Sequence, residues 1–401
     1  MTIAQAYCIH SPNWSGDIQA RFAWNTSIKR GIKANEGRSQ LKTWPHRSLS
    51  YSVDLPTRIE RNAFAELMWY NFHKIFGVPW WPEGSPLTAQ AASGQAVLQL
   101  DTTYRSFSQG QSVVLVSNYG SYAVGTIYLK DDTSITLLAN LAATWPAGTM
   151  VYPLLQCRFS GRSSELKQLN SNFGEVNLQF REVYEADAMY IAGSHGFPTY
   201  NDFPVFNKEP NWANEPSVDI VRDVDLLESL GVSASYSHPD VSTIILSLDY
   251  MCKTRQECFA MESFFNTMAG RWGQFWVPTW CQDISINGAV VNTDTVLSVD
   301  DTNYDGTWFT NDLLGRILFF KNYDGTEAYK YVTGATATTI ILDSAIGLDC
   351  SLGNLSSLVS SFLLPVRFDE DEMEMTYAND SFAEISLRMT SQDDSEMSPI
   401  P

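Results

Sequence analysis

Two stretches of sequence decide the fold: RIERNAFAELMWYNFHKIFG at residues 58–77 and TRQECFAMESFFNTMAGRWG at residues 254–273. Apolar side chains recur every four residues in each stretch, which predicts an amphipathic helix with one apolar stripe. The stripe positions are Phe64, Met68, Phe72 and Phe76 and, shifted by 196 residues, Ala260, Phe264, Met268 and Trp272. Each stretch ends in a glycine, Gly77 or Gly273, which we expect to stop the helix in the left-handed conformation.

The sequence around the two helices repeats as well. Before each helix, SLSYSVDL (48–55) and IILSLDY (244–250) alternate apolar and polar residues, as a strand does. After each helix come VPWWP (78–82) and QFWVP (274–278). The same shift pairs Trp80 with Trp276 and Pro82 with Pro278.

A second pair of matching blocks closes each half of the chain. CRF (157–159) matches VRF (366–368), and FGEVNLQF (173–180) matches FAEISLRM (382–389), both with a shift of 209 residues. Between the blocks, each half holds short alternating stretches separated by Gly, Asn and Asp, which predict a small β-barrel or sandwich. The chain is therefore predicted to be a duplication with a mainly β (α+β) fold. Each repeat has one packed helix and one inserted β module.

These boundaries divide the chain into four parts. We predict repeat A at 1–190 with an insert at about 83–153, a linker or arm at 191–217, repeat B at 218–390 with an insert at about 279–363, and a flexible tail at 391–401. The linker is rich in Pro, Gly and Asn and has no period. Its aromatic residues indicate that it packs against other parts of the protein.

Composition excludes several functional classes. The 401 residues include 26 Lys and Arg against 45 Asp and Glu, a net charge of −19, so no basic footprint for nucleic acid is expected. The first residues lack the basic and apolar regions of a signal peptide. No run of about 18 apolar residues predicts a membrane span. The six cysteines form no CxxC pair, and we expect free thiols in a reducing cytoplasm.

No catalytic, cofactor-binding or metal site is predicted, and we expect that the protein is not an enzyme. The five histidines lie in no metal or nucleophile motif; they are His10, His46, His73, His195 and His238. The acidic run DEDEMEM (369–375) reads as a solvated loop.

One stretch resembles a calcium loop. Residues 301–312, DTNYDGTWFTND, place Asp301, Asn303, Asp305 and Asp312 at the spacing of calcium ligands, with Gly306 where the loop turns sharply. The final glutamate of such loops is absent, and the matching stretch of repeat A (101–110) lacks the acids. A plain turn is therefore favoured, and calcium binding at this stretch remains an alternative.

The whole pattern resembles the tail-tube-like domains of distal tail and baseplate hub proteins of long-tailed, siphovirus-type bacteriophages. The resemblance rests on residues 263–278, 145–159 and 173–180. It implies a structural component of the tail tip, assembled in the host cytoplasm and resident in the virion. That component would join the tail tube to baseplate hub or fibre proteins and line the channel through which DNA passes, without specific nucleic-acid binding or membrane insertion.

The resemblance also implies self-association into a ring. Such domains pair edge strands around an axis, six to a ring, which removes the exposed sheet edges. Two tandem copies would complete a pseudo-sixfold ring from three chains, and a hexamer is the alternative.

Two other functions stay open. A carbohydrate- or receptor-binding β module of a virion would expose aromatic platforms such as Trp308, Tyr119 and Tyr323. A cell-wall hydrolase would need catalytic signatures that the sequence does not contain.

Overall fold

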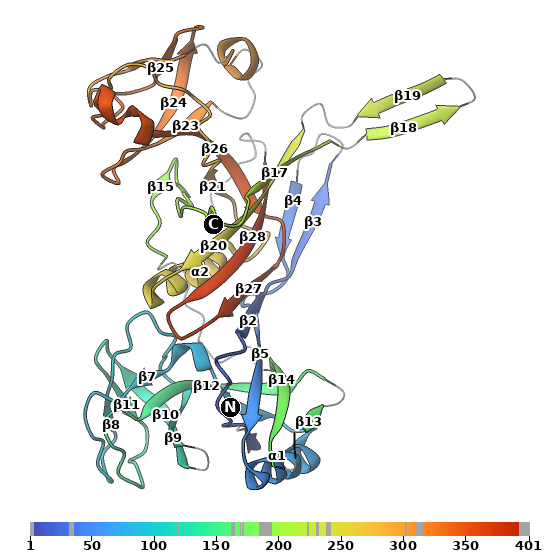
Figure 1. The fold of residues 1–401 in the computed structure, drawn as a ribbon, viewed down its shortest axis with the longest axis vertical. Helices are drawn as coiled ribbons and strands as arrows, with labels where there is room; N and C mark the ends of the chain where they lie inside the picture. Colours follow the sequence, from blue (N-terminus) through green and yellow to red (C-terminus); the bar gives the residue numbers. More distant parts are fainter. Residues whose placement is uncertain are drawn as a thin grey trace.

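The computed structural model confirms a mainly β fold with two helices of 14 residues (Figure 1). It describes residues 4–31, 36–118, 121–161, 165–168, 170, 172–183, 195–222, 224–229, 232–237, 242–300, 303–309 and 316–392. Residues 393–401, most of the predicted tail, lie outside this part of the chain, as do residues 191–194 of the predicted linker.

The first half is built around one antiparallel sheet and a smaller β module. The strands are β1 (Ala6–Tyr7), β2 (Ile18–Ala23), β3 (Thr26–Arg30), β4 (Glu36–Gln40), β5 (His46–Leu55), β6 (Phe76–Pro79), β7 (Ser85–Pro86), β8 (Val97–Gln99), β9 (Ser112–Asn118), β10 (Ser121–Lys130), β11 (Ser134–Leu137), β12 (Met150–Phe159), β13 (Leu166–Gln168) and β14 (Gly174–Glu182). Helix α1 is Arg58–Asn71, and a short turn η1 spans Trp81–Glu83. Strands β2, β5, β14 and β12 pair in that order, with β6 beyond β12 and β1 beyond β6.

The second half repeats this element order. After the short strands β15 (Thr199–Tyr200) and β16 (Phe203–Pro204), its elements are β17 (Ser217–Val221), β18 (Val224–Ser229), β19 (Val232–Ser237), β20 (Thr243–Cys252), α2 (Arg255–Met268), β21 (Phe275–Pro278), β22 (Val296–Ser298), η2 (Asp305–Phe309), β23 (Ile317–Lys321), β24 (Glu327–Ala335), β25 (Thr339–Leu342), η3 (Leu352–Ser357), β26 (Val359–Phe368), β27 (Glu372–Tyr377) and β28 (Ala383–Ser391). Strand for strand, β17 corresponds to β2, β20 to β5, β26 to β12, β27 to β13 and β28 to β14.

The two helices begin alike but do not end at the predicted glycines. Thr57 and Thr254 cap the N-termini, and each side chain accepts a hydrogen bond from the backbone N–H three residues later. The helices end at Asn71 and Met268, and the left-handed residues after α2 are Ala269 and Gly270, with φ 51° and 65°. Prediction of a glycine stop was therefore wrong, because the chain leaves each helix several residues before Gly77 or Gly273.

This early exit also changes which residues are equivalent. Since the helix caps lie 197 residues apart, Met68 corresponds to Phe265 rather than to Phe264. The connection from α2 to β21 is two residues longer than that from α1 to β6, so Pro79 corresponds to Pro278. Both prolines sit opposite equivalent leucines, Leu154 of β12 and Leu363 of β26. The predicted pairing of Pro82 with Pro278, and with it that of Trp80 with Trp276, was wrong.

The inserted modules are joined to the repeats by long strands. In β12, Met150–Pro153 pair with β9, whereas Leu154–Cys157 pair with β6. The first module has an apolar core of its own, which includes Leu98, Phe107, Ile135 and Trp145. The connection between the repeats is not loose, because Phe203, Val205 and Phe206 are buried.

Candidate functional site: the junction between the repeats

The two repeats share one continuous sheet, because β2 of repeat A pairs along its whole length with β27 of repeat B. Strand β2 is Ile18–Ala23, and its inward side chains Ile18, Ala20 and Phe22 are fully buried. On the outward side, the Arg21 guanidinium contacts Glu372 at 3.1 Å and Glu374 at 2.7 Å. The prediction of a solvated loop at 369–375 was wrong, since Met373 and Met375 alternate with these acids and are buried.

A hairpin reaches from repeat A onto repeat B. We call β3–β4 the first arm; it continues β2 (Figure 1) and contacts β26 and the segment before β27. Glu36 accepts two hydrogen bonds from Arg367 of β26, at 2.8 and 3.0 Å, and both side chains are almost completely buried. The Arg38 guanidinium donates to the carbonyl oxygen of Trp272 at 3.1 Å. Thr26 N–H donates to the carboxylate of Asp371 at 2.8 Å.

Helix α2 is buried at this junction and carries a network of charges. The Arg255 guanidinium lies 2.9 Å from a carboxylate oxygen of Glu83 in repeat A and 3.6 Å from Glu262 on its own helix. Glu83 also accepts hydrogen bonds from the N–H and hydroxyl of Ser106. Burial and the nearby Glu83 carboxylate raise the pKa of Glu262 to about 8. Burial therefore favours the protonated form of Glu262, and of these two carboxylates the Arg255 guanidinium lies closer to Glu83.

The surfaces equivalent to the two sides of this junction are exposed elsewhere in the chain. In β17, Val218 and Ile220 hold the positions of Ala20 and Phe22 but are 49% and 74% exposed. Among the described residues, β17 pairs only with β20, and β13 pairs only with β14. These two strands are open edges, one on each repeat.

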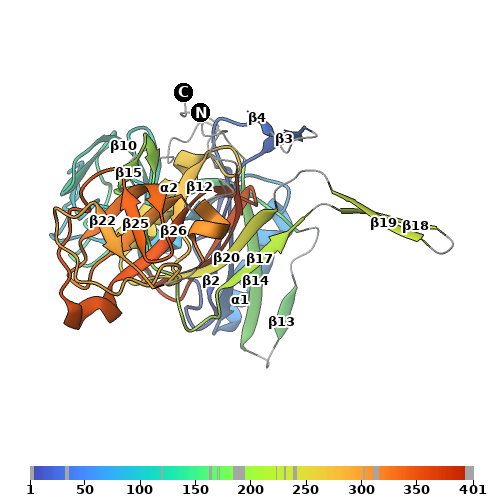
Figure 2. The ribbon, with the colours of Figure 1, turned by 90° about the horizontal axis from the view of Figure 1, so that it is seen from above.

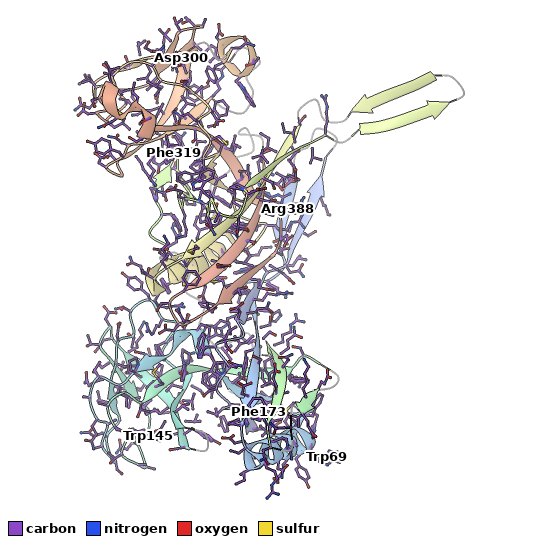
Figure 3. All side chains as sticks on the ribbon, viewed as in Figure 1. Trp69, Trp145, Phe173, Asp300, Phe319 and Arg388 are labelled. Carbon is purple, nitrogen blue, oxygen red and sulfur yellow. The ribbon has the colours of Figure 1, made fainter. Side chains whose placement is uncertain are left out.

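Helix α1 shows the same contrast with α2. Trp69 holds the position of Asn266, which is buried and accepts a hydrogen bond from Trp24. Trp69 itself is 84% exposed at the end of the molecule far from the second inserted module (Figure 3). Repeat B thus has a helix face that repeat A covers, whereas the matching face of repeat A is open.

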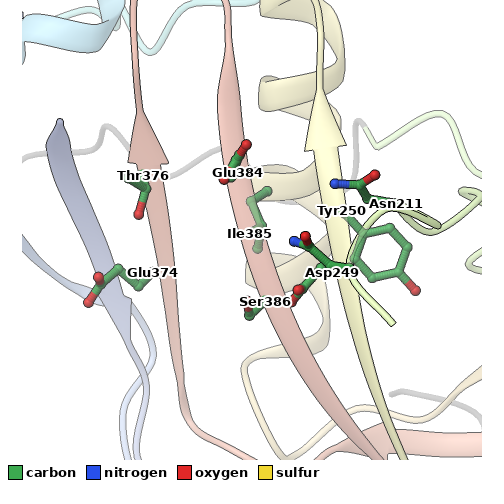
Figure 4. A pocket seen from close by; sticks show the side chains of 9 residues that line it. Asn211, Asp249, Tyr250, Glu374, Thr376, Glu384, Ile385 and Ser386 are labelled. Carbon is green, nitrogen blue, oxygen red and sulfur yellow. Dashed lines mark hydrogen bonds between the residues drawn. The ribbon is translucent and has the colours of Figure 1, made fainter. Parts of the chain in front are cut away.

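The outward face of the shared sheet is polar in both repeats. It includes a shallow cavity of about 220 Å³ on β20, β27 and β28, lined by carboxylates of Asp249, Glu374 and Glu384 (Figure 4). Among the residues that the structure describes, no group of three or more His, Cys, Asp and Glu side chains could hold a metal ion. We assign no ligand to this cavity.

The structure places the other residues singled out in the sequence apart from one another. His10 is buried edge-on against Phe64, and burial lowers its pKa to about 4. Of the calcium-like stretch, Asp301 and Asp312 lie outside the described residues, and Asp305 begins η2. Of the aromatic platforms, Trp308 packs on Phe362 and Tyr323 is exposed, whereas Tyr119 lies outside the described residues.

Comparisons with known proteins leave the family open. Neither the models of known protein families nor the curated proteins include a match to this chain. Among the described helices, neither is long and apolar enough to cross a membrane.

Proposed function

We propose that this protein is a structural component of a phage tail tip that self-associates into a ring around the DNA channel. The observation that carries the proposal is the junction itself. Repeat A offers β2 and repeat B offers β27, so the contact is head-to-tail, and a head-to-tail contact can be repeated from chain to chain. Strand β17 is left over as the counterpart of β2, and β13 as the counterpart of β27.

The register of the β2–β27 pair defines the pairing between chains. Ala20 faces Met375 within the chain, so Val218 of one chain would face Leu166 of the next. In the same register Ser217 would face Lys167. This pairing would cover the exposed apolar residues of β17 and satisfy the backbone groups of both edges.

The two repeats of one chain already lie side by side in one sheet. If the ring contains six such domains, as the resemblance implies, three chains would close it. The polar outward face would then line the lumen, and its carboxylates, with the net charge of −19, would keep DNA from adhering. The inserted modules would contact tail tube, hub or fibre proteins. The exposed Tyr323 alone does not favour a glycan-binding module, because Trp308 is packed into the protein.

The test is the solution mass and particle symmetry of the purified full-length chain. Light scattering should give the mass of a trimer, and negative-stain images should show a ring with a central hole. Gold-labelled antibodies should bind the tail tips of phage particles that contain the chain. A compact monomer without a hole at every concentration, with no label on tails, would contradict the proposal.

A further inference from the structure

The hairpin β18–β19, here called the second arm, is the counterpart of the first arm. It continues β17 as the first arm continues β2, and it projects away from the body of the molecule (Figure 2). Glu36 lies ten residues before the start of β5, and Ser233 lies ten residues before the start of β20. Ser233 therefore holds the register position of Glu36.

The surface that receives the first arm has a counterpart on repeat A. Arg367, which holds Glu36, is opposite Thr390 of β28, and Arg158 is opposite Arg181 in the equivalent pair of β12 and β14. Arg367 is 2% exposed beneath the first arm, whereas Arg158 and Arg181 are exposed. Arg158 makes no ion pair with any residue that the structure describes.

We infer that the second arm docks on the Arg158–Arg181 surface of a neighbouring copy of this chain. The inference rests on the proposed ring and goes beyond it, since a ring could close through β17 and β13 alone. Continuity with the first arm, which occupies the matching surface within the chain, identifies the occupant as a second copy.

Charge supports this assignment. The first arm, residues 26–40, contains four Lys and Arg and one Glu, and this Glu36 pairs with Arg367 on the surface beneath the arm. The second arm, residues 224–237, contains Asp225 and Glu228 and no Lys or Arg. Its matching surface carries the cations Arg158 and Arg181. An arm with acids and no cations on a surface with two exposed cations is electrostatically complementary, as Glu36 on Arg367 is within the chain.

A second pair of residues also differs between the junction within the chain and the equivalent positions of the proposed contact between chains. Trp24 donates to Asn266 where the first arm begins. The corresponding positions hold Arg222 and Trp69, a guanidinium and an exposed indole, which can form a cation–π contact between chains.

Cross-linking of full-length variants tests the inference. Cys281 is the exposed one among the six cysteines, so all variants carry Cys281→Ser. A control pair, Arg21→Cys with Glu374→Cys, lies at exposed facing positions of β2 and β27 and should be joined by a short bismaleimide within one chain. Ser233→Cys with Arg158→Cys should instead give dimers and closed trimers on a denaturing gel. Ser233→Cys with Lys130→Cys, on the first inserted module, controls for random collision.

The outcomes separate this inference from the proposed function. A ring in which only the control pair cross-links within the chain would overturn the docking of the second arm and leave the ring standing. Single chains in every experiment would overturn both. As a second measurement, Arg158→Glu with Arg181→Glu should weaken association at least tenfold in sedimentation, whereas Lys130→Glu should not. Association equal to that of the unmodified chain would overturn the inference.

Discussion

Substitution of Ile220 by Asp should prevent the chains from associating while leaving the single chain folded. Ile220 is 74% exposed, whereas Phe22 at the equivalent position is fully buried in the core that the two repeats share. Complete burial of an isoleucine contributes about 1.5–3 kcal/mol, so covering the exposed three-quarters contributes roughly 1–2 kcal/mol per contact. An unpaired polar group in the same place costs about 1–3 kcal/mol more. The total, at least about 2 kcal/mol, corresponds to association about 30-fold weaker at each contact.

Sedimentation velocity across a range of protein concentrations measures this change directly. Leu138, which is 70% exposed on the first inserted module, provides the matched control. Leu138→Asp should assemble as the unmodified chain does. Because Ile220 is exposed in the single chain, Ile220→Asp should change the free energy of unfolding by no more than about 0.5 kcal/mol. Normal assembly of Ile220→Asp would refute the reasoning that β17 is an interface strand.

Three further predictions concern charges. In the proposed register Asp219 faces Glu165, whereas Arg21 faces Glu374 within the chain; Asp219→Lys should therefore tighten association by about 0.2–1 kcal/mol, measured by sedimentation. Arg255→Met leaves the buried Glu83 without its cation and should lower the free energy of unfolding in urea by about 3–5 kcal/mol, with part regained on adding Glu83→Gln. The raised pKa of Glu262 means that its burial costs nothing at acid pH and increasingly more as the pH rises to about 8. Glu262→Gln should thus have nearly the same free energy of unfolding in urea as the unmodified chain at pH 4 and a higher one at pH 8; an equal difference at both pH values would contradict the raised pKa.

The sequence was sufficient to find the helices and the duplication, because periodic burial of apolar residues is a local property. It was insufficient to align the repeats around the helix ends. Aligning the two halves with a constant shift of 196 residues assumes that the connection after each helix has the same length. The connection from α2 to β21 is two residues longer than that from α1 to β6. The alignment of Pro79 with Pro278 depends on their partners in β12 and β26, which only the folded sheet identifies.

The junction itself was missed for a different reason. The run 369–375 was interpreted by its acids, although Met373 and Met375 alternate with them as in a half-buried strand. Its partner β2 lies some 350 residues earlier, and pairing between such distant strands leaves no local pattern. The alternation of apolar and acidic residues in 369–375, rather than the number of acids, would have identified the strand. It would not have identified the strand with which it pairs.

The two arms show why a duplicated chain keeps its junctions distinct. If both arms and both docking surfaces had kept the same charge, either arm could occupy either surface, and chains could exchange arms or extend into irregular polymers. The first arm carries four Lys and Arg, so docking it on the Arg158–Arg181 surface would place like charges together, whereas the acidic second arm is complementary to that surface. The opposite charge of the two arms is therefore the result we would expect if two junctions share a geometry, one within the chain and one, as proposed, between chains.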